Sequence, residues 1–388
     1  MLTLHTEVPR ENVSMSPRVY NFSPGPAVLP ERVLAEVGRD LMALPGVGAS
    51  ILEISHRSAA FDNILRQAET NLRTLLAVPD DYAVLFLQGG ARLQFSMVPM
   101  NLAGSSQRGV GSTGPGAGSP SYIVTGSWGK YALQEAAKVG GVHTAWNGSA
   151  TNFDRLPKQA ELPLDPRAAY VYFTSNETIQ GVQFAAEPEV GDVPLVCDAS
   201  SDFLSRPVDI RKYGLYYGCA QKNAGPAGVT IVILRKDLLA RSSDSLPGYL
   251  NYNSHFDQGS MWNTPPTFAI YVLMLVTKWL LTDVGGLKQM HLLNQAKAKL
   301  LYDVIDQSDG FYAGHAQPNC RSLMNVTFRL RNEELTAKFV SGALERGLTE
   351  LKGHRSVGGI RASIYNAMPV AGVELLREYM IEFSSANQ

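Results

Sequence analysis

The amino-acid sequence predicts an α/β protein whose mostly parallel central sheet is covered by helices, with a smaller α+β domain at the C-terminal end. The first observation is that the short strand-like runs are continuously apolar, which is typical of strands buried on both faces. The second is that helix-like stretches separate several of these runs. The third is a change of pattern after residue 281. We therefore expect a large domain over 31–281, a small domain over 282–388, and an N-terminal segment, 1–30, that packs with the small domain.

Composition limits the class of protein. A chain of 388 residues is long enough for two domains. Its 45% hydrophobic and 18% charged residues predict a large core and argue against disorder. With 34 basic and 35 acidic residues, the net charge of −1 argues against nucleic-acid binding and against a polybasic membrane anchor.

The termini and cysteines predict a soluble, cytoplasmic protein. Cys197, Cys219 and Cys320 are widely spaced and form no CxxC pair, so neither a disulfide framework nor a metal site is expected. Residues 1–20 have no apolar core and do not resemble a signal peptide. The longest apolar run, 267–281, is too short to span a bilayer and contains Lys278, so it is interpreted as a buried helix.

The predicted elements follow from these patterns in order. Pro30 begins the first helix, because proline is favoured in a first helical turn. Apolar periodicity predicts a second helix over 61–77 and another over 129–139. The predicted strands are 82–87, 122–125, 170–174, 195–198, 215–219 and 230–234. The small domain is predicted to contain a long helix through 300–305, a strand at 324–328, and helices at 333–345 and 373–383.

A low-complexity patch at 105–120 contains a formal GxGxxG at 109–114. A dinucleotide-binding fingerprint must follow a strand and open a helix, whereas here polar residues precede the motif and a strand follows it. We interpret the patch as a surface insertion. The sequence contains no P-loop, HExxH or GxSxG motif, so NTPase, zinc-protease and α/β-hydrolase activities have no support.

Asp198 and Lys222 are the first candidates for chemistry. Asp198 ends a short apolar strand, where an ionised carboxylate is costly without a cationic partner. Lys222 follows another such strand and is flanked by small residues. This pair suits pyridoxal phosphate, with the lysine forming a Schiff base and the aspartate keeping the ring nitrogen protonated. The alternative is a structural ion pair at the edge of the sheet.

Three further features follow predicted strands. Residues 89–92 (GGAR) lead into a predicted helix, whose backbone N–H groups could hold a phosphate. Trp128 could stack on a flat ring, although ordinary packing is the usual role of tryptophan. Thr178, in TSNETIQG, places a hydroxyl at the same edge of the sheet.

Seven motifs together resemble the class V aminotransferases, which are fold-type I pyridoxal-phosphate enzymes. They are NFSPGPAVLP, EISHRS, GGARLQF, NETIQG, AQKNAGPAG, MWNTPPTF and GHRSVGGIRASIYNA, and the resemblance runs from about residue 21 to 383. It implies a homodimer with shared active sites. The implied reaction is a ping-pong transamination between L-glutamate and 3-phosphohydroxypyruvate, giving O-phospho-L-serine and 2-oxoglutarate in serine biosynthesis. A second implied product is 4-phosphohydroxythreonine, on the route to pyridoxal phosphate.

The resemblance also implies roles for individual residues. Lys222 corresponds to the Schiff-base lysine, Asp198 to the pyridinium partner, Trp128 to the stacking residue and Thr178 to the hydroxyl on the ring oxygen. The implied phosphate ligands are Ala91, Arg92 and Gln221, joined by Asn263 and Thr264 of the other subunit. The implied substrate ligands are Arg361 for the α-carboxylate and His56, Arg57, His354 and Arg355 for the distal anion. Ala91 departs from the glycine of some members, which is harmless if only its N–H is used.

The arginines also make sense without the family. A guanidinium pairs with carboxylate and phosphate through two parallel hydrogen bonds, and a substrate with one of each anion needs two such sites. Any single arginine or histidine is more often a solvated surface residue. The His-Arg pair occurs twice, at 56–57 and 354–355, each time in a turn rich in glycine or serine, which favours the binding role.

Two other activities remain as alternatives. A cysteine desulfurase, also of class V, needs a nucleophilic cysteine on a mobile loop, and Cys320 is the C-terminal candidate. It directly precedes a predicted strand, however, and cysteine as a substrate gives the paired His-Arg motifs no role. A non-catalytic small-molecule-binding protein would not need a lysine beside a glycine-rich turn.

Overall fold

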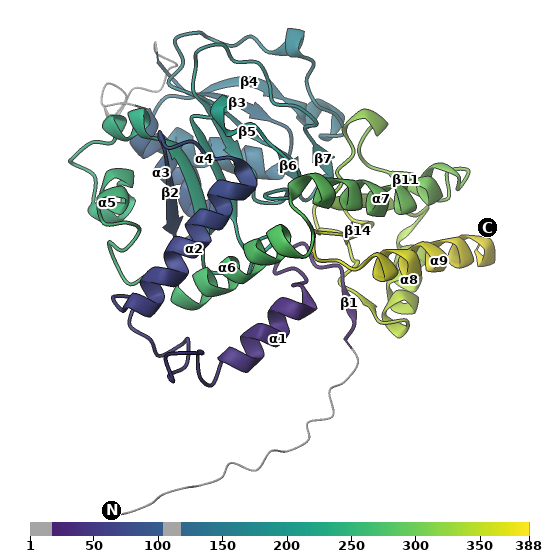
Figure 1. Ribbon diagram of the computed structural model, residues 1–388. Helices are drawn as coiled ribbons and strands as arrows, with labels where there is room; N and C mark the ends of the chain where they lie inside the picture. The colour runs from purple at the N-terminus through teal and green to yellow at the C-terminus, as the bar shows by residue number, and fades with distance from the viewer. Residues whose placement is uncertain (1–17, 104–117, 388) are drawn as a thin grey trace, which may run out of the picture.

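A computed structural model describes residues 18–103 and 118–387 and has a seven-stranded sheet at its centre (Figure 1). The strand order is β2-β10-β9-β8-β5-β3-β4. The strands are β2 (Tyr82–Leu87), β3 (Ser121–Val124), β4 (His143–Asn147), β5 (Val171–Thr174), β8 (Leu195–Asp198), β9 (Leu215–Cys219) and β10 (Thr230–Arg235). Within this sheet β10 pairs antiparallel with both neighbours, and the other pairs are parallel. The predicted fold class is confirmed.

Helices cover both faces of this sheet, which explains the continuous apolar runs. In β2, Val84 and Phe86 belong to the core beneath α2 and α6, whereas Leu85 and Leu87 belong to the core beneath α3 and α4. Successive side chains of a strand point to opposite faces. Because both faces of β2 are covered, a polar side chain at any of its positions would be buried. The helices are α1 (Glu31–Asp40), α2 (Ala59–Leu76), α3 (Gly90–Leu102), α4 (Ser127–Val139), α5 (Tyr252–Asp257) and α6 (Thr267–Thr282).

A second core lies at the C-terminal end of the chain. It joins α7 (Leu287–Asp306), α8 (Glu333–Glu345) and α9 (Val370–Ala386) to a three-stranded antiparallel sheet. The strands of this sheet are β11 (Ala313–Gly314), β12 (Asn325–Arg329) and β14 (Ile360–Ser363). Near the start of the chain, β1 (Tyr20–Asn21) pairs with β13 (Leu348–Thr349), and the buried Phe22 joins the same core. This packing supports the division into 1–30, 31–281 and 282–388, which we keep as a proposal.

Of the described strands with four or more residues, two were not predicted from the sequence. Strand β4 lies at an edge of the sheet with only Ala145 fully buried, so it does not form a continuous apolar run. Strand β14 lies inside a motif whose glycines and charged residues obscure it. A short hairpin, β6 (Asn176–Glu177) with β7 (Val182–Gln183), extends from the end of β5. Residues 1–17 and the GxGxxG at 109–114 lie outside the described residues.

The predicted core helix at 267–281 is α6, which packs against α2. Asn71 of α2 donates from Nδ2 to Oγ1 of Thr277 at 3.1 Å inside this contact. Among the described helices no single one has the length and apolarity to cross a membrane, although α6 and α7 together, bent by 87°, reach that length and composition.

Candidate active site

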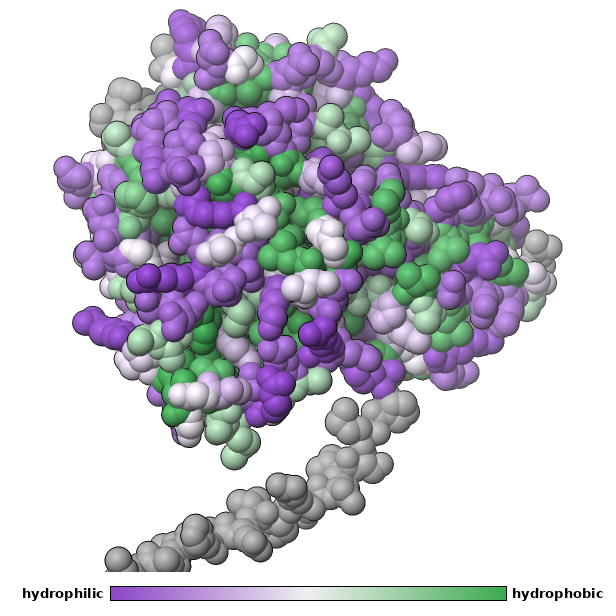
Figure 2. Space-filling view, in the orientation of Figure 1, coloured by the Kyte–Doolittle hydropathy of each residue, from purple (hydrophilic) through white to green (hydrophobic). Residues whose placement is uncertain are grey.

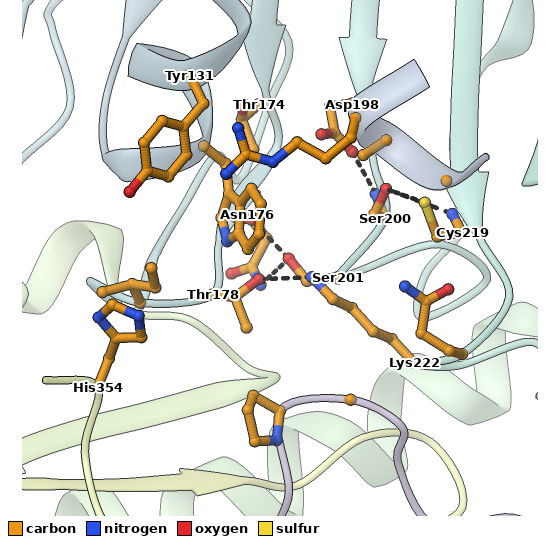
Figure 3. Close-up of a pocket in the computed structure, with 18 of the residues that line it drawn as sticks. Tyr131, Thr174, Asn176, Thr178, Asp198, Ser200, Ser201, Cys219, Lys222 and His354 are labelled. Atoms are coloured by element: carbon orange, nitrogen blue, oxygen red, sulfur yellow. Dashed lines mark hydrogen bonds between the residues drawn. The ribbon is translucent and has the colours of Figure 1, made fainter. Parts of the chain in front are cut away.

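A cavity of about 770 Å³ opens at the carboxyl ends of the parallel strands. Three strands deliver their last residues to it: β5 ends at Thr174, β8 at Asp198 and β9 at Cys219. Ligands of open α/β sheets bind at this edge, because the loops that follow the strands can diverge there. The second unit, formed by the C-terminal core, lines the cavity with His354, Arg355 and Arg361. Figure 3 shows His354 on the side of the cavity away from Asp198.

Asp198 and Lys222 come together in this cavity. The buried Asp198 accepts a hydrogen bond at Oδ1 from the backbone N–H of Ser200 at 2.9 Å. Burial raises the pKa of Asp198, and the opposite charge of Lys222 offsets part of that rise. Burial likewise lowers the pKa of Lys222, whose Nζ donates to Oγ1 of Thr178 at 2.7 Å. A lysine with a lowered pKa has more of the neutral amine that reacts with a carbonyl.

The turn before α3 forms an anion cradle. Gly89 and Gly90 have φ values of +85° and +64°, which only glycine adopts without strain. Ala91 and Arg92 follow in the first turn of α3, so the positive end of that helix opens on the cavity. The Arg92 guanidinium lies 4.2 Å from the ring centre of Tyr131. Gln221 lines the same cavity.

Trp128 is held by a residue that the sequence analysis did not single out. Both oxygens of the fully buried Glu177 accept backbone N–H bonds at the start of α4, from Trp128 at 2.9 Å and from Gly129 at 2.8 Å. Gln180 accepts a third such bond from Ser127 at 3.2 Å. Burial raises the pKa of Glu177 to about 7, although the two N–H bonds oppose the rise. The signal in the sequence is the NETIQG motif, in which Glu177 directly precedes Thr178.

The cavity fits pyridoxal phosphate. It offers a carboxylate for the ring nitrogen, a hydroxyl for the ring oxygen, a lysine, and a helix N-terminus for the phosphate. Several buried polar atoms of lining residues also have no hydrogen-bond partner within the described part of the chain. These atoms are Oγ1 of Thr174, Oδ1 of Asn176, Nε1 of Trp128 and Nε of Arg361. Buried polar groups are normally paired, so their common position indicates a polar ligand.

The second unit supplies cationic and neutral donors. Arg361, on β14, is 7% exposed, and burial lowers its pKa. His354 accepts at Nδ1 from the backbone N–H of Ser356 at 3.2 Å, so in the neutral ring Nε2 carries the hydrogen. Burial lowers the pKa of His354, with Arg361 and Arg355 adding to the effect. The exposed Arg355 lines the cavity beside it.

Ten of the fourteen predicted site residues line the cavity of this single chain. They are Ala91, Arg92, Trp128, Thr178, Asp198, Gln221, Lys222, His354, Arg355 and Arg361. His56, Arg57, Asn263 and Thr264 are not among its lining residues. Asn263 instead donates from Nδ2 to Oε1 of Gln88 at 2.9 Å. The roles of all fourteen remain predictions.

The structure adds lining residues that sequence reasoning missed. Tyr131 lies one helical turn after Trp128, and that spacing could have found it. Ser200 follows Asp198 by two residues, the offset at which a backbone N–H meets an aspartate side chain. Pro24 and Gly25 reach the cavity from the N-terminal segment, which no local pattern indicates.

Cys320 lies outside this cavity. It is buried, its thiol contacts the backbone oxygen of Asp154 at 3.5 Å, and burial raises its pKa. A nucleophilic cysteine needs the opposite, an exposed thiol with a lowered pKa. The desulfurase alternative therefore loses its candidate nucleophile.

Residues 19–376 match the aminotransferase class-V family, and the chain belongs to that family. It is accordingly an aminotransferase, and the prediction of pyridoxal phosphate as cofactor is confirmed. Within the class, curated relatives of high identity are phosphoserine aminotransferases. The Rhodopirellula baltica phosphoserine aminotransferase is 56% identical over 380 residues, 97% of this chain and 98% of that protein.

Solved structures agree with this similarity. The phosphoserine aminotransferase of Bacillus circulans subsp. alkalophilus superposes with a TM-score of 0.91 at 46% identity, over 96% of this chain and all of that chain. The phosphoserine aminotransferase of Trichomonas vaginalis, solved with pyridoxal phosphate bound, gives 0.86 at 38% identity, over 94% of this chain and all of that chain.

Proposed function

We propose that this aminotransferase transfers the amino group of L-glutamate to 3-phosphohydroxypyruvate, giving O-phospho-L-serine and 2-oxoglutarate for serine biosynthesis. The observation that supports it best is the composition of one cavity. Asp198 and Lys222 line it from the sheet, while Arg361, Arg355 and His354 line it from the other unit. Both substrates carry an anion at each end, and these cationic and neutral donors give each anion a partner.

Residues from the sheet handle the cofactor and the proton. Bound pyridoxal phosphate supplies an electron sink at the carbon that loses its hydrogen. Asp198 keeps the ring nitrogen protonated, since a carboxylate at that position stabilises the charged form. Nζ of Lys222 accepts the proton from the α-carbon of the amino acid and would deliver it to the aldehyde carbon of the bound cofactor. The Thr178 hydroxyl, already 2.7 Å from Nζ, keeps the lysine directed into the cavity.

Residues from the second unit handle the substrate anions. Arg361 binds the carboxylate that the two substrates share. His354 and Arg355, with His56 and Arg57, bind the distal carboxylate or phosphate. A phosphate has up to about two charges and three acceptor oxygens, so it uses more of these donors than a carboxylate does. 4-Phosphohydroxythreonine has the same two anions one carbon further apart and is a second proposed product.

We place the complete site in a homodimer. His56 and Arg57 follow an exposed apolar segment in which Met42 is 83% and Leu52 is 61% exposed. Figure 2 shows apolar side chains along the lower edge of the molecule, over α1 and the chain that follows it. Trp262, beside Asn263 and Thr264, is 48% exposed. A second copy that covers these apolar surfaces would bring the four remaining residues to the neighbouring cavity.

The absorption spectrum of the purified protein, before and after L-glutamate, tests the first half-reaction. Added 3-phosphohydroxypyruvate should then restore the first spectrum, whereas pyruvate, which lacks the distal phosphate, should not. If pyruvate restores it equally fast, the proposed substrate class is wrong. The shared site is tested by mixing an inactive Lys222→Ala chain with an inactive Arg57→Ala chain, because mixed dimers should regain one complete site.

Three buried thiols also favour the cytoplasm as the compartment.

A further inference from the structure

Helix α7 connects the two cores of the molecule. Leu287 and Met290 belong to the core beneath α2 and α6, whereas Ala298 and Leu301 belong to the C-terminal core. Between them lies Lys297, which is 1% exposed. A buried ammonium is costly unless hydrogen bonds or a counter-charge compensate it, so Lys297 requires an explanation.

Lys297 is compensated by backbone carbonyls. Its Nζ lies 3.0 Å from the oxygen of Ile364, 2.7 Å from that of Tyr365, and 3.3 Å from those of Asn366 and Met368. Across residues 18–103 and 118–387, no carboxylate forms an ion pair with it. Nζ of Lys297 therefore gathers the carbonyls of one short segment, 364–368, around a single point.

This segment is continuous with the substrate side of the cavity. It begins immediately after β14, the strand that contains Arg361. The Tyr365 hydroxyl donates to the backbone oxygen of Pro24 at 2.8 Å, and Pro24 lines the cavity. Moving segment 364–368 would therefore move both Arg361 and a wall of the site.

The same segment is tied to the lysine loop. The backbone N–H of Asn366 donates to Oδ1 of Asn223 at 2.9 Å, and Asn223 directly follows Lys222. Asn294, one turn before Lys297 on α7, donates from Nδ2 to Oδ1 of Asn366 at 2.9 Å and to the backbone oxygen of Ser205 at 3.1 Å. These side chains are buried, and hydrogen bonds between buried groups are stronger than the same bonds in water.

We propose that Lys297 is a positioning residue, which with Asn294 fixes the distance between Arg361 and Lys222. The inference rests on the proposed function, since it assigns Arg361 the substrate carboxylate. Its physical basis is that Arg361 and Lys222 lie on separate packing units. Among the described residues, these units are joined by one isolated β-bridge, between Val182 and Arg321, and by individual hydrogen bonds rather than by a shared sheet. This distance matters because a misplacement of about 1 Å costs on the order of 100-fold in rate.

The test compares Lys297→Met with Lys299→Met in the cofactor-loaded enzyme. Methionine keeps an unbranched side chain, one atom shorter than that of lysine, and donates no hydrogen bond. Lys299, on the same helix, pairs with Asp303 at 2.7 Å and is 73% exposed, so its replacement is the matched control. If Lys297→Met does not fold, Asn294→Ala removes the neighbouring bonds and replaces it in both measurements.

The first measurement is amide hydrogen exchange, which needs no substrate. Lys297→Met should speed exchange at least about tenfold at 361–368 and at 222–225, and Lys299→Met should leave both unchanged. Unchanged exchange in both segments of Lys297→Met would overturn the coupling.

The second measurement separates positioning from stability. Lys297→Met should retain the cofactor absorbance of the wild type but raise KM for glutamate about tenfold, with a smaller change in kcat. Faster exchange with an unchanged KM would overturn the positioning role. A wild type that does not transaminate glutamate would instead refute the proposed function, and the exchange data would still decide the coupling.

Discussion

Glu177→Gln should change how the stability of the protein depends on pH. Glu177 is fully buried, and both of its oxygens accept backbone N–H bonds from the first turn of α4. Burial raises its pKa from the ordinary 4.5 to about 7. In the unfolded chain the same carboxyl has its ordinary pKa, so the folded state binds a proton more tightly than the unfolded state does.

The direction and the magnitude of the change in stability follow from the difference between the folded and unfolded pKa values of Glu177. Proton binding stabilises the folded state fully below about pH 4.5, and this stabilisation is lost as the pH rises through 7. At about 1.4 kcal/mol per pH unit, the free energy lost is about 3 kcal/mol. With an unfolding entropy of about 2 cal/mol/K per residue, a chain of this length loses roughly 4 °C in Tm. The glutamine at position 177 does not titrate, so the variant should not lose this part of its stability.

The assay is thermal unfolding of cofactor-free wild type and Glu177→Gln from pH 5 to pH 8 at one scan rate. The Tm of the variant minus that of the wild type should increase by about 3 °C across this range, which covers most of the titration. Asp198 and Asp202 are also buried carboxyls with raised pKa values, but both proteins contain them, so their contributions largely cancel.

Glu135→Gln is the matched control. Glu135 lies on α4, the helix that Glu177 contacts, and pairs with Lys138 at 2.8 Å, and Lys138 is 69% exposed. Such pairs contribute little, so its difference from the wild type should stay within about 1 °C throughout. A Glu177→Gln difference that does not vary with pH would show that burial does not perturb this carboxyl as described.

The other predictions concern the active site. Lys222→Ala should lower turnover at least ~1,000-fold while leaving Tm near the wild-type value, and near-normal turnover would remove its catalytic role. Asp198→Asn should retain the cofactor absorbance but slow the half-reaction with glutamate about 100-fold, and an unchanged rate would make Asp198 structural. Arg361→Ala should lower kcat/KM for both substrates by about 10- to 100-fold, since it removes a charge-assisted pair. Arg355→Ala should reduce kcat/KM for phosphohydroxypyruvate more than for glutamate, and equal losses would contradict its distal-phosphate role.

The sequence by itself determined the class of fold and the cofactor end of the site. Strands 82–87, 195–198 and 215–219 have the predicted bounds, because residues buried on both faces must be apolar in an unbroken run. Asp198 and Lys222 could be singled out because charged residues directly after such runs are costly. Parallel strands bring their carboxyl ends to one edge, so these two residues were expected to meet.

Only the tertiary structure decided how the site is held together. Glu177 contacts α4 from a hairpin 48 residues along the chain, and no local periodicity reports such a bond. Lys297 looks like any other helix lysine in the sequence, and its burial results from the docking of segment 364–368 against α7. Arg361 likewise belongs to a strand hidden in a glycine-rich motif. Local sequence encodes the burial of each strand, whereas contacts between distant segments depend on how the two cores pack. That packing brings Arg361 and Lys222 to the same cavity.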